Sequence, residues 1–204
     1  MKSDNVVFAV AGIMFGLIAG WIIGAQQAGS RAPIPAPAAA AAPAGNPAAS
    51  RPAVLDEQQV QALRSIADRE PSNPRPRTQL ANLYFDAEKY DDAIKWYEAA
   101  MKLEPRDPNL STDLGVSYYY TNQPDKALEL FAHSLKLDPK HIKTLLNLGI
   151  VRAFGKQDLD GAAQAWQQVI EISPDSPEGQ AARRALDSLR SAHPGPAAAQ
   201  KPGP

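Results

Sequence analysis

The sequence predicts an all-α protein in which a stack of helix pairs follows one separate membrane-spanning helix. A polar residue followed by proline recurs four times, at intervals of 34, 34 and 35 residues. A fixed period of this length is typical of solenoids built from helix pairs. Residues 6–25 form a continuous apolar run without a charge. The four proline-containing pairs are Glu70-Pro71, Glu104-Pro105, Asp138-Pro139 and Ser173-Pro174.

The apolar run at residues 6–25 is expected to cross a membrane. At about 1.5 Å of helical rise per residue, it matches a hydrocarbon core of about 30 Å. The alternative is a cleaved signal peptide, but this run is longer than the apolar part of such peptides, and Gln26 and Gln27 occupy the cleavage zone. The short tail of residues 1–5 favours a cytoplasmic amino terminus. We therefore expect a single-pass membrane protein whose remaining chain is extracytoplasmic, which in a bacterium means periplasmic.

Glycine recurs at every fourth position within this apolar run. Such spacing places the glycines on one face of a helix and lets a second helix approach closely. We therefore expect this face to pack against a partner's helix or against a second copy of the chain, which would give a homo-oligomer. The glycines are Gly12, Gly16, Gly20 and Gly24.

The segments at residues 26–54 and 192–204 are rich in proline and alanine. They have too few large apolar side chains to bury a core, and their prolines prevent a continuous helix. We expect a disordered linker and a disordered tail. At about 3.1 Å per residue, the proline-rich part of the linker would extend up to about 70 Å from the membrane.

The charge balance and the residue types exclude several classes of function. With 21 basic and 22 acidic residues, the chain has no basic field to attract nucleic acid. It has no cysteine, and His133, His141 and His193 lack metal-ligand spacing. It also has no glycine-rich phosphate loop or nucleophile motif. We therefore expect no catalysis and no cofactor, metal or nucleic-acid partner.

The second helix of each pair is predicted from an apolar stripe with i, i+3, i+7 spacing. Asp91 and Asp160 are placed to cap two of these helices, and Pro124 suits the first turn of the other. Stacking the pairs would bury the stripes, at roughly 1.5 to 3 kcal/mol per large side chain. The stripe residues are Ile94, Tyr97 and Met101, then Leu128, Phe131 and Leu135, then Ala163, Trp166 and Ile170.

Small and aromatic residues at fixed offsets make residues 74–175 resemble the tetratricopeptide-repeat (TPR) family. In the first helices a leucine precedes a small residue, and in the second helices an alanine precedes an aromatic ring by four positions. The resemblance implies an all-α TPR helical-hairpin solenoid with repeats at 74–107, 108–141 and 142–175. The matching residues are Leu80-Ala81, Leu114-Gly115, Leu148-Gly149, Ala93 with Tyr97, Ala127 with Phe131, and Ala162 with Trp166.

A further family position in the first helices is aromatic at Tyr84 and Tyr118 but is Arg152 in the third repeat. We expect Phe154 to offset this departure in part, and we assign Tyr118 to the core rather than to a binding surface.

Two flanking helices are expected to cover the ends of the stack. Residues 55–73 resemble the second helix of a degenerate preceding repeat, with Asp56 and Gln59 spaced as a capping box. Residues 176–191 would close the other end through Ala182, Ala185, Leu186 and Leu189, with their arginines facing water.

The resemblance implies a concave groove that is lined by the first helices and holds an extended peptide or a partner's helix. Its aromatic rings and amides suit a peptide with apolar side chains. Some family members clamp a C-terminal carboxylate, and Asn82 and Lys143 match that pattern. Thr78, Asp113 and Asn147 do not match, so such a clamp is not expected. The groove positions carried over by register are Arg75, Thr78, Asn82, Phe85, Asn109, Thr112, Tyr119, Tyr120, Lys143, Asn147, Ile150 and Phe154.

Together these features imply a membrane-tethered adaptor or scaffold that binds a protein or peptide client. The layout is similar to that of membrane-bound TPR proteins that assist cytochrome c biogenesis or attend the secretion translocon, so a narrower expectation is an envelope assembly or maturation factor. The alternative is a structural subunit that oligomerises through the glycine face within a larger membrane complex.

Overall fold

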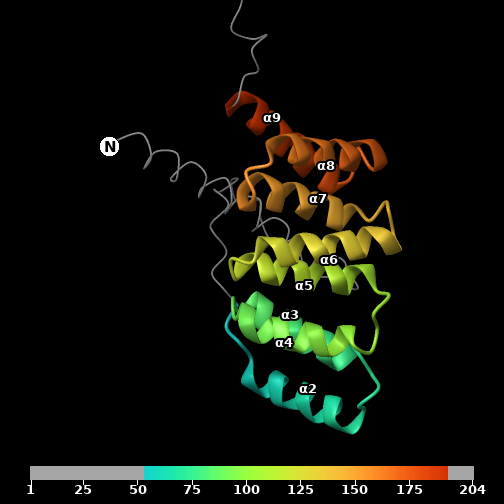
Figure 1. The fold of residues 1–204 in the computed structure, drawn as a ribbon. Helices are drawn as coiled ribbons and strands as arrows, with labels where there is room; N and C mark the ends of the chain where they lie inside the picture. The colour runs from blue at the N-terminus through green and yellow to red at the C-terminus, as the bar shows by residue number, and fades with distance from the viewer. Residues whose placement is uncertain (1–52, 193–204) are drawn as a thin grey trace, which may run out of the picture. The chain divides into compact units, whose positions relative to one another are not determined.

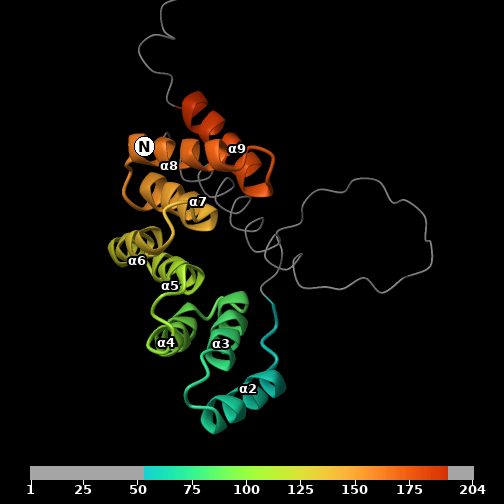
Figure 2. The same cartoon turned by 90° about the vertical axis from the view of Figure 1, so that its right-hand side faces the viewer.

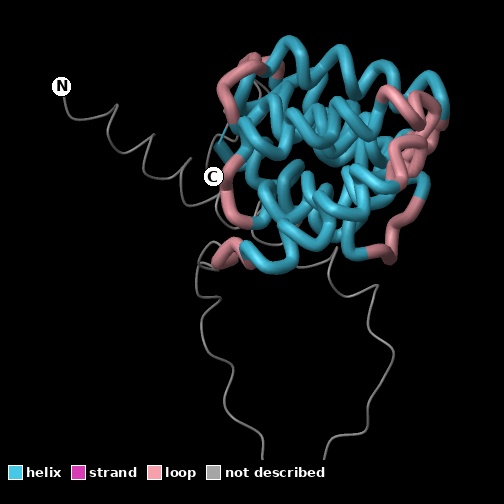
Figure 3. The backbone as a smooth tube through the Cα atoms, turned by 90° about the horizontal axis from the view of Figure 1, so that it is seen from below, coloured by secondary structure: helices cyan, strands magenta, loops and turns pink. Residues whose placement is uncertain are grey.

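The computed structural model describes residues 53–192, and within that range the chain forms helices and loops with no strand (Figure 3). The apolar run at 6–25 and its glycines, nearly all of the linker, and residues 193–204 of the tail lie outside it. No helix between residues 53 and 192 is long and apolar enough to cross a bilayer. The elements are α2 (Glu57–Arg69), α3 (Arg75–Asp86), α4 (Tyr90–Met101), α5 (Pro108–Tyr120), α6 (Pro124–Leu137), α7 (Ile142–Ile150), η1 (Val151–Gly155), α8 (Leu159–Ile172) and α9 (Pro177–Ala192).

The helices pack as three consecutive pairs, α3 with α4, α5 with α6, and α7–η1 with α8. The pairs lie in layers one above another, with α2 beyond the first pair and α9 beyond the last (Figure 1). In Figure 2, α3 and α5 lie to the right of α4 and α6, whereas α7 lies below α8. The described residues therefore form an all-α helical repeat domain.

Aspartate caps explain where three of the helices begin. The carboxylates of Asp56, Asp107 and Asp158 accept hydrogen bonds from backbone N–H groups in the first turns of α2, α5 and α8, at 2.7 to 3.3 Å. These bonds satisfy donors that have no partner inside the helix. The predicted cap at Asp56 is confirmed.

The predicted caps at Asp91 and Asp160 are wrong. α4 begins at Tyr90 and α8 at Leu159, so both aspartates lie inside the first turn. There their charge still favours the positive end of the helix dipole. Pro124 is the first residue of α6, as expected, because proline needs no donor at that position.

Within each pair, the two helices are joined by a three-residue loop, and the three loops have the same left-handed middle residue. The middle residue is left-handed, with φ of 57° at Glu88, 60° at Asn122 and 56° at Gln157. The following N–H bonds back to a carbonyl of the first helix, that of Tyr84 in the first loop and that of Tyr118 in the second. These bonds are typical of the Schellman motif that ends many helices.

The extra residue of the third repeat is taken up inside the first helix as the π-helical turn η1. In this turn the N–H of Lys156 bonds the carbonyl of Val151, five residues back, at 3.1 Å. The loop bond then runs from Asp158 to the carbonyl of Arg152, six residues back instead of five. The loop itself and α8 keep the geometry of the earlier repeats because the π turn contains the insertion.

Small residues on the first helices allow the second helices to approach. A Cβ on Gly115 would lie 2.7 Å from Cε1 of Phe131, and a Cβ on Gly149 would lie 2.2 Å from Nε1 of Trp166. The indole N–H of Trp166 donates to the carbonyl of Leu146 at 3.2 Å. An added Cβ would therefore press on the facing ring at both positions, and the overlap would be larger at Gly149.

The predicted stripes face the interior, and their central rings are the most buried. Tyr97, Phe131 and Trp166 are 2%, 0% and 1% exposed. Ile94 is also buried, whereas the outer members of the stripes are half-buried. One cluster joins α2, α3, α4 and α5 through Val60, Leu63, Leu80, Ala81, Tyr84, Ala93, Ile94, Tyr97, Ala100, Leu110 and Leu114.

The expectation that Phe154 would offset Arg152 is wrong. Phe154 is 39% exposed, whereas Tyr84, at the equivalent position of Arg152, is 6% exposed. Arg152 instead donates to the carbonyl of Gly161 at 3.2 Å and lies 3.7 Å from the carboxylate of Asp158. It therefore ties the end of the first helix to the start of α8 without filling the core.

Both flanking helices pack on the stack with their expected apolar faces. α2 buries Val60, Leu63 and Ala67 against α3. α9 contacts α8 and buries Gly179, Ala181, Ala182, Ala185 and Leu186, and Leu189 is half-buried. The arginines of α9 at positions 183, 184 and 190 are exposed.

Candidate binding groove

The predicted groove positions lie on the first helices, but they differ in accessibility. Four are exposed and five are half-buried, so nine side chains are accessible to a partner in this conformation. The exposed residues are Arg75, Asn82, Asn109 and Phe154, and the half-buried residues are Thr78, Phe85, Tyr119, Tyr120 and Lys143.

Thr112, Asn147 and Ile150 are buried, with exposed fractions of 0%, 4% and 5%. Thr112 donates to the carbonyl of Pro108, and the amide of Asn147 donates to the carbonyl of Lys143. Because Thr112 and Asn147 have hydrogen-bond partners inside the protein and Ile150 is an apolar buried side chain, the three residues stabilise the wall of the groove and do not face a guest.

A hydroxyl cluster joins the second and third repeats behind this wall. The oxygens of Thr112, Ser134 and Thr144 lie 2.6 to 3.1 Å from one another. His141 extends the cluster, with Nδ1 2.6 Å from Thr144 and Nε2 3.1 Å from the amide oxygen of Asn109. Burial lowers the pKa of His141, and the nearby ammonium of Lys143 contributes to the same direction. A neutral imidazole thus holds exposed Asn109 against the repeat junction.

Two acidic residues of the first helices neighbour predicted groove positions in sequence, Asp86 at the end of α3 and Asp113 on α5. Asp113 forms an ion pair with Lys143 of α7. Burial raises the pKa of Asp86, and repulsion by Asp113 adds to the increase. Asn82 lies on the same helix as Asp86, and its amide oxygen accepts a 2.6 Å hydrogen bond from the hydroxyl of Tyr97.

Four aromatic side chains, Phe85, Tyr90, Tyr119 and Tyr120, meet where α3 and α5 end, and we call this set the aromatic corner. Tyr90 and Tyr120 are stacked, with ring centroids 4.5 Å apart and planes 9° apart. Phe85 meets both edge to face, at 5.3 and 5.7 Å, and Tyr119 lies 6.0 Å from Tyr120. These are the favourable geometries for aromatic pairs. The corner is therefore a preformed apolar surface.

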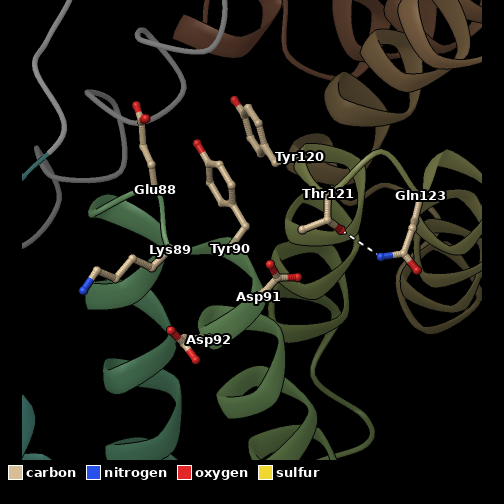
Figure 4. Close-up of a pocket in the computed structure, with 8 residues that line it drawn as sticks. All are labelled: Glu88, Lys89, Tyr90, Asp91, Asp92, Tyr120, Thr121 and Gln123. Carbon is tan, nitrogen blue, oxygen red and sulfur yellow. Dashed lines mark hydrogen bonds between the residues drawn. The ribbon is translucent and has the colours of Figure 1, made fainter.

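An open pocket borders the aromatic corner. Figure 4 shows Tyr90 and Tyr120 standing side by side, with the Glu88 carboxylate near their hydroxyl ends. Burial, with repulsion by Glu88, raises the pKa of Tyr90 to about 12, so its hydroxyl is neutral at physiological pH. The pocket is lined by Glu88, Lys89, Tyr90, Asp91, Asp92, Tyr120, Thr121 and Gln123.

Tyr118 packs against the core cluster that joins α2 to α5, as expected, but the core does not enclose it. Its ring is half-buried, its hydroxyl donates to Glu98 of the preceding repeat, and the ammonium of Lys126 lies 4.7 Å from the ring centroid. Tyr118 therefore links neighbouring repeats at the surface. His133 has a packing role, with Nδ1 3.2 Å from the hydroxyl of Ser111.

The sequence interpretation missed Tyr90 and Asp86 as groove residues. Tyr90 opens a second helix and therefore lies outside the first-helix register, whereas Asp86 directly follows a predicted groove position. Its position at the end of the same helix, one residue after Phe85, could have indicated that Asp86 lies near the groove. No group of three or more histidine, aspartate or glutamate side chains within residues 53–192 is arranged to hold a metal ion.

The comparisons with known proteins agree with this geometry. The family described as TPR repeat matches residues 81–122, and the family described as tetratricopeptide repeat matches 109–141 and 143–176. No curated protein matches the sequence.

Among solved structures, the first TPR of Spaghetti (RPAP3) bound to the HSP90 peptide SRMEEVD is 25% identical, with a TM-score of 0.52 over 68% of this chain and 95% of that one. The Sgt2 TPR domain from Aspergillus fumigatus is also 25% identical, with a TM-score of 0.55 over 64% and 86%. MamA is 16% identical, with a TM-score of 0.54 over 68% and 89%, and shares the fold.

Proposed function

Because this chain is a tetratricopeptide-repeat protein, we propose that it is a non-enzymatic adaptor that binds an extended segment of a partner protein along the first helices. The single observation that carries this proposal is the aromatic corner, with four preformed rings where α3 and α5 end, on the same first helices that present exposed Asn82 and Asn109. Rigid aromatic surfaces ringed by polar groups are typical anchors for peptides, because little entropy is lost when they are covered. A similar TPR domain, that of RPAP3, is described with a bound peptide, which supports the same use here.

The proposal includes a membrane tether. Residues 6–25 are long and apolar enough to span a bilayer, and the proline-rich linker would give the adaptor reach. The short amino-terminal tail favours a repeat domain outside the cytoplasm. In that setting the adaptor would serve as an envelope assembly or maturation factor.

Site-specific crosslinking tests the groove. A photoreactive amino acid at Asn82 or Asn109 should capture a discrete partner in the native membrane, because both positions are exposed on the first helices. The same amino acid at Arg183, exposed on α9, is the matched control and should not capture that partner. Equal capture from all three positions, or none from the groove positions, contradicts groove binding.

A second candidate is a structural subunit that oligomerises through the glycine face at Gly12, Gly16, Gly20 and Gly24. The regular spacing of these glycines favours helix association. Replacing Gly16 and Gly20 by isoleucine should abolish assembly if this face drives it, as measured by crosslinking of the intact chain in membranes. Unchanged assembly, with retained capture at Asn109, would leave the adaptor as the function.

A further inference from the structure

The carboxylates around the aromatic corner lack cationic partners. Within residues 53–192, Asp86, Glu88 and Asp91 form no ion pair, whereas Asp92 pairs with Lys95 and Asp125 with Lys156. The last turns of α3 and α5 also contain no basic residue, although helix carboxyl ends favour cations. The lining of the adjoining pocket has three carboxylates, Glu88, Asp91 and Asp92, and one cation, Lys89, so this end of the groove has excess negative charge.

The structure keeps this charge at an energetic cost. The carboxylate of Asp86 is partly desolvated and is repelled by Asp113, so its ionised form is disfavoured. A cation from a partner would favour the ionised carboxylate and so offset both effects. Perturbed carboxylates of this kind are concentrated at functional sites.

The aromatic corner offers a second feature that suits a cation. The stacked rings of Tyr90 and Tyr120 border the pocket, and Glu88 lies at their hydroxyl ends (Figure 4). A lysine or arginine side chain can pack its aliphatic stem on such rings while its charge reaches the carboxylate. The same pocket would disfavour an acidic side chain.

The groove is not arranged for an anionic guest. Lys143 is held by Asp113, and Arg75 begins α3 at the end opposite to the aromatic corner. At this end of the groove a partner segment with acidic side chains would meet Glu88, Asp91 and Asp92 against a single cation of the pocket lining, Lys89.

We propose that the partner segment is basic, with one lysine or arginine side chain against the Tyr90–Tyr120 pair beside Glu88 and further positive charge near Asp86. This inference rests on the proposed function, since it specifies the chemistry of the partner that the groove binds. It predicts selectivity by charge along with recognition of apolar side chains.

A random dodecapeptide library displayed on phage, selected against the intact chain, tests this inference. Peptides that bind should be enriched in lysine and arginine. They should be lost with the groove-blocked variant Asn82→Trp/Asn109→Trp, whose bulky side chains fill exposed groove positions. In a synthetic copy of a selected peptide, replacing the basic residues by glutamine should weaken binding about tenfold.

Two double variants with the same net charge distinguish a local effect of these carboxylates from an effect of the overall charge of the protein. Asp86→Asn/Glu88→Gln should weaken binding of the basic peptide about tenfold, whereas Asp125→Asn/Asp187→Asn, which removes two exposed carboxylates outside the pocket, should stay within about twofold. Circular dichroism of each variant checks that the helices are intact.

The outcomes distinguish the two proposals. Groove-dependent peptides that are neutral or acidic, or equal losses in the two double variants, overturn the basic partner and leave groove binding in place. If wild type and the groove-blocked variant select the same peptides, or neither selects any, groove binding itself fails and the basic partner fails with it.

Discussion

The carboxylate of Asp113 on α5 is paired with the ammonium of Lys143 on α7, across the wall between the second and third repeats. Their side chains are 20% and 24% exposed, so the pair is shielded from most solvent. Lys143 is one of the two residues that match the carboxylate-clamping pattern of some TPR proteins. Here its ammonium is already paired with the carboxylate of Asp113. Asp113 therefore neutralises the lysine that could otherwise bind the free C-terminal carboxylate of a peptide.

Removing this acid should create a preference that the wild type lacks. The wild type should bind a basic peptide equally well with a free or an amidated C-terminus. Asp113→Asn should favour the free acid by about three- to tenfold, because Lys143 becomes available for a charge-assisted bond. Fluorescence polarisation with the two peptides measures the ratio, and Asp113→Asn/Lys143→Ala should return it to about one. A wild type that already prefers the free acid contradicts this account.

The two glycines that face aromatic rings should differ in their tolerance of alanine. Gly149→Ala should lower the free energy of unfolding by about 1–3 kcal/mol, since Cβ would overlap the indole of Trp166. Gly115→Ala should change it by less than about 1 kcal/mol, because the closest atom is the ring edge of Phe131 and alanine favours the helix. Urea denaturation measures both, and Trp166→Phe should restore part of the loss at Gly149. Equal effects would show that the close contact does not decide stability.

The left-handed loop residues should become more stable as glycine. Gln157→Gly should raise the free energy of unfolding by about 0.5–1 kcal/mol, because glycine adopts positive φ without a Cβ clash. Asn122→Gly should gain less, since asparagine tolerates this conformation. Lys156→Gly is the control, because its φ of −121° needs no glycine and the change should destabilise. A loss at Gln157 as large as at Lys156 contradicts the prediction.

Neutralising Asp86 should stabilise the fold in a pH-dependent way. Its pKa in the folded chain is raised above 3.8, so between these two values the native state binds more protons than the unfolded state. Stability therefore falls as pH rises through that window. Asp86→Asn should be more stable than wild type at pH 7, with the difference vanishing below about pH 3.8. Thermal unfolding across pH measures this, with exposed Asp125→Asn as the control. A destabilised variant at pH 7 would refute the desolvation argument.

The sequence was sufficient to predict the helix pairs because the packing of one helix on its partner fixes both the spacing of the apolar residues and their burial. A ring such as Phe131 or Trp166 must face a small residue of its partner helix, and the proline after each pair ends it. The first helices and the stripes were therefore predicted correctly. The caps at Asp91 and Asp160 were predicted wrongly because acidic residues suit both the cap and the first turn of a helix.

The groove was less predictable because the position of a residue in the repeat fixes the direction of its Cβ but not which atoms of other helices surround the side chain. Thr112 occupies a groove register, yet hydroxyls from Ser134 and Thr144 draw it into the interior. Tyr90 enters the aromatic corner from a second helix, which the register of first helices does not include. Partners from other repeats decide which of two adjacent faces a side chain occupies, and a single sequence does not contain that information.

The π turn at Val151–Gly155 shows how a solenoid withstands a change in its length. One additional residue in a regular α-helix would rotate everything downstream by about 100°. Here a single widened turn absorbs it, so Trp166 meets Gly149 much as Phe131 meets Gly115 one layer earlier. The number of residues in a repeat can therefore change while the packing of the helix pairs stays regular. An insertion at this point leaves the following helices packed as in the earlier repeats.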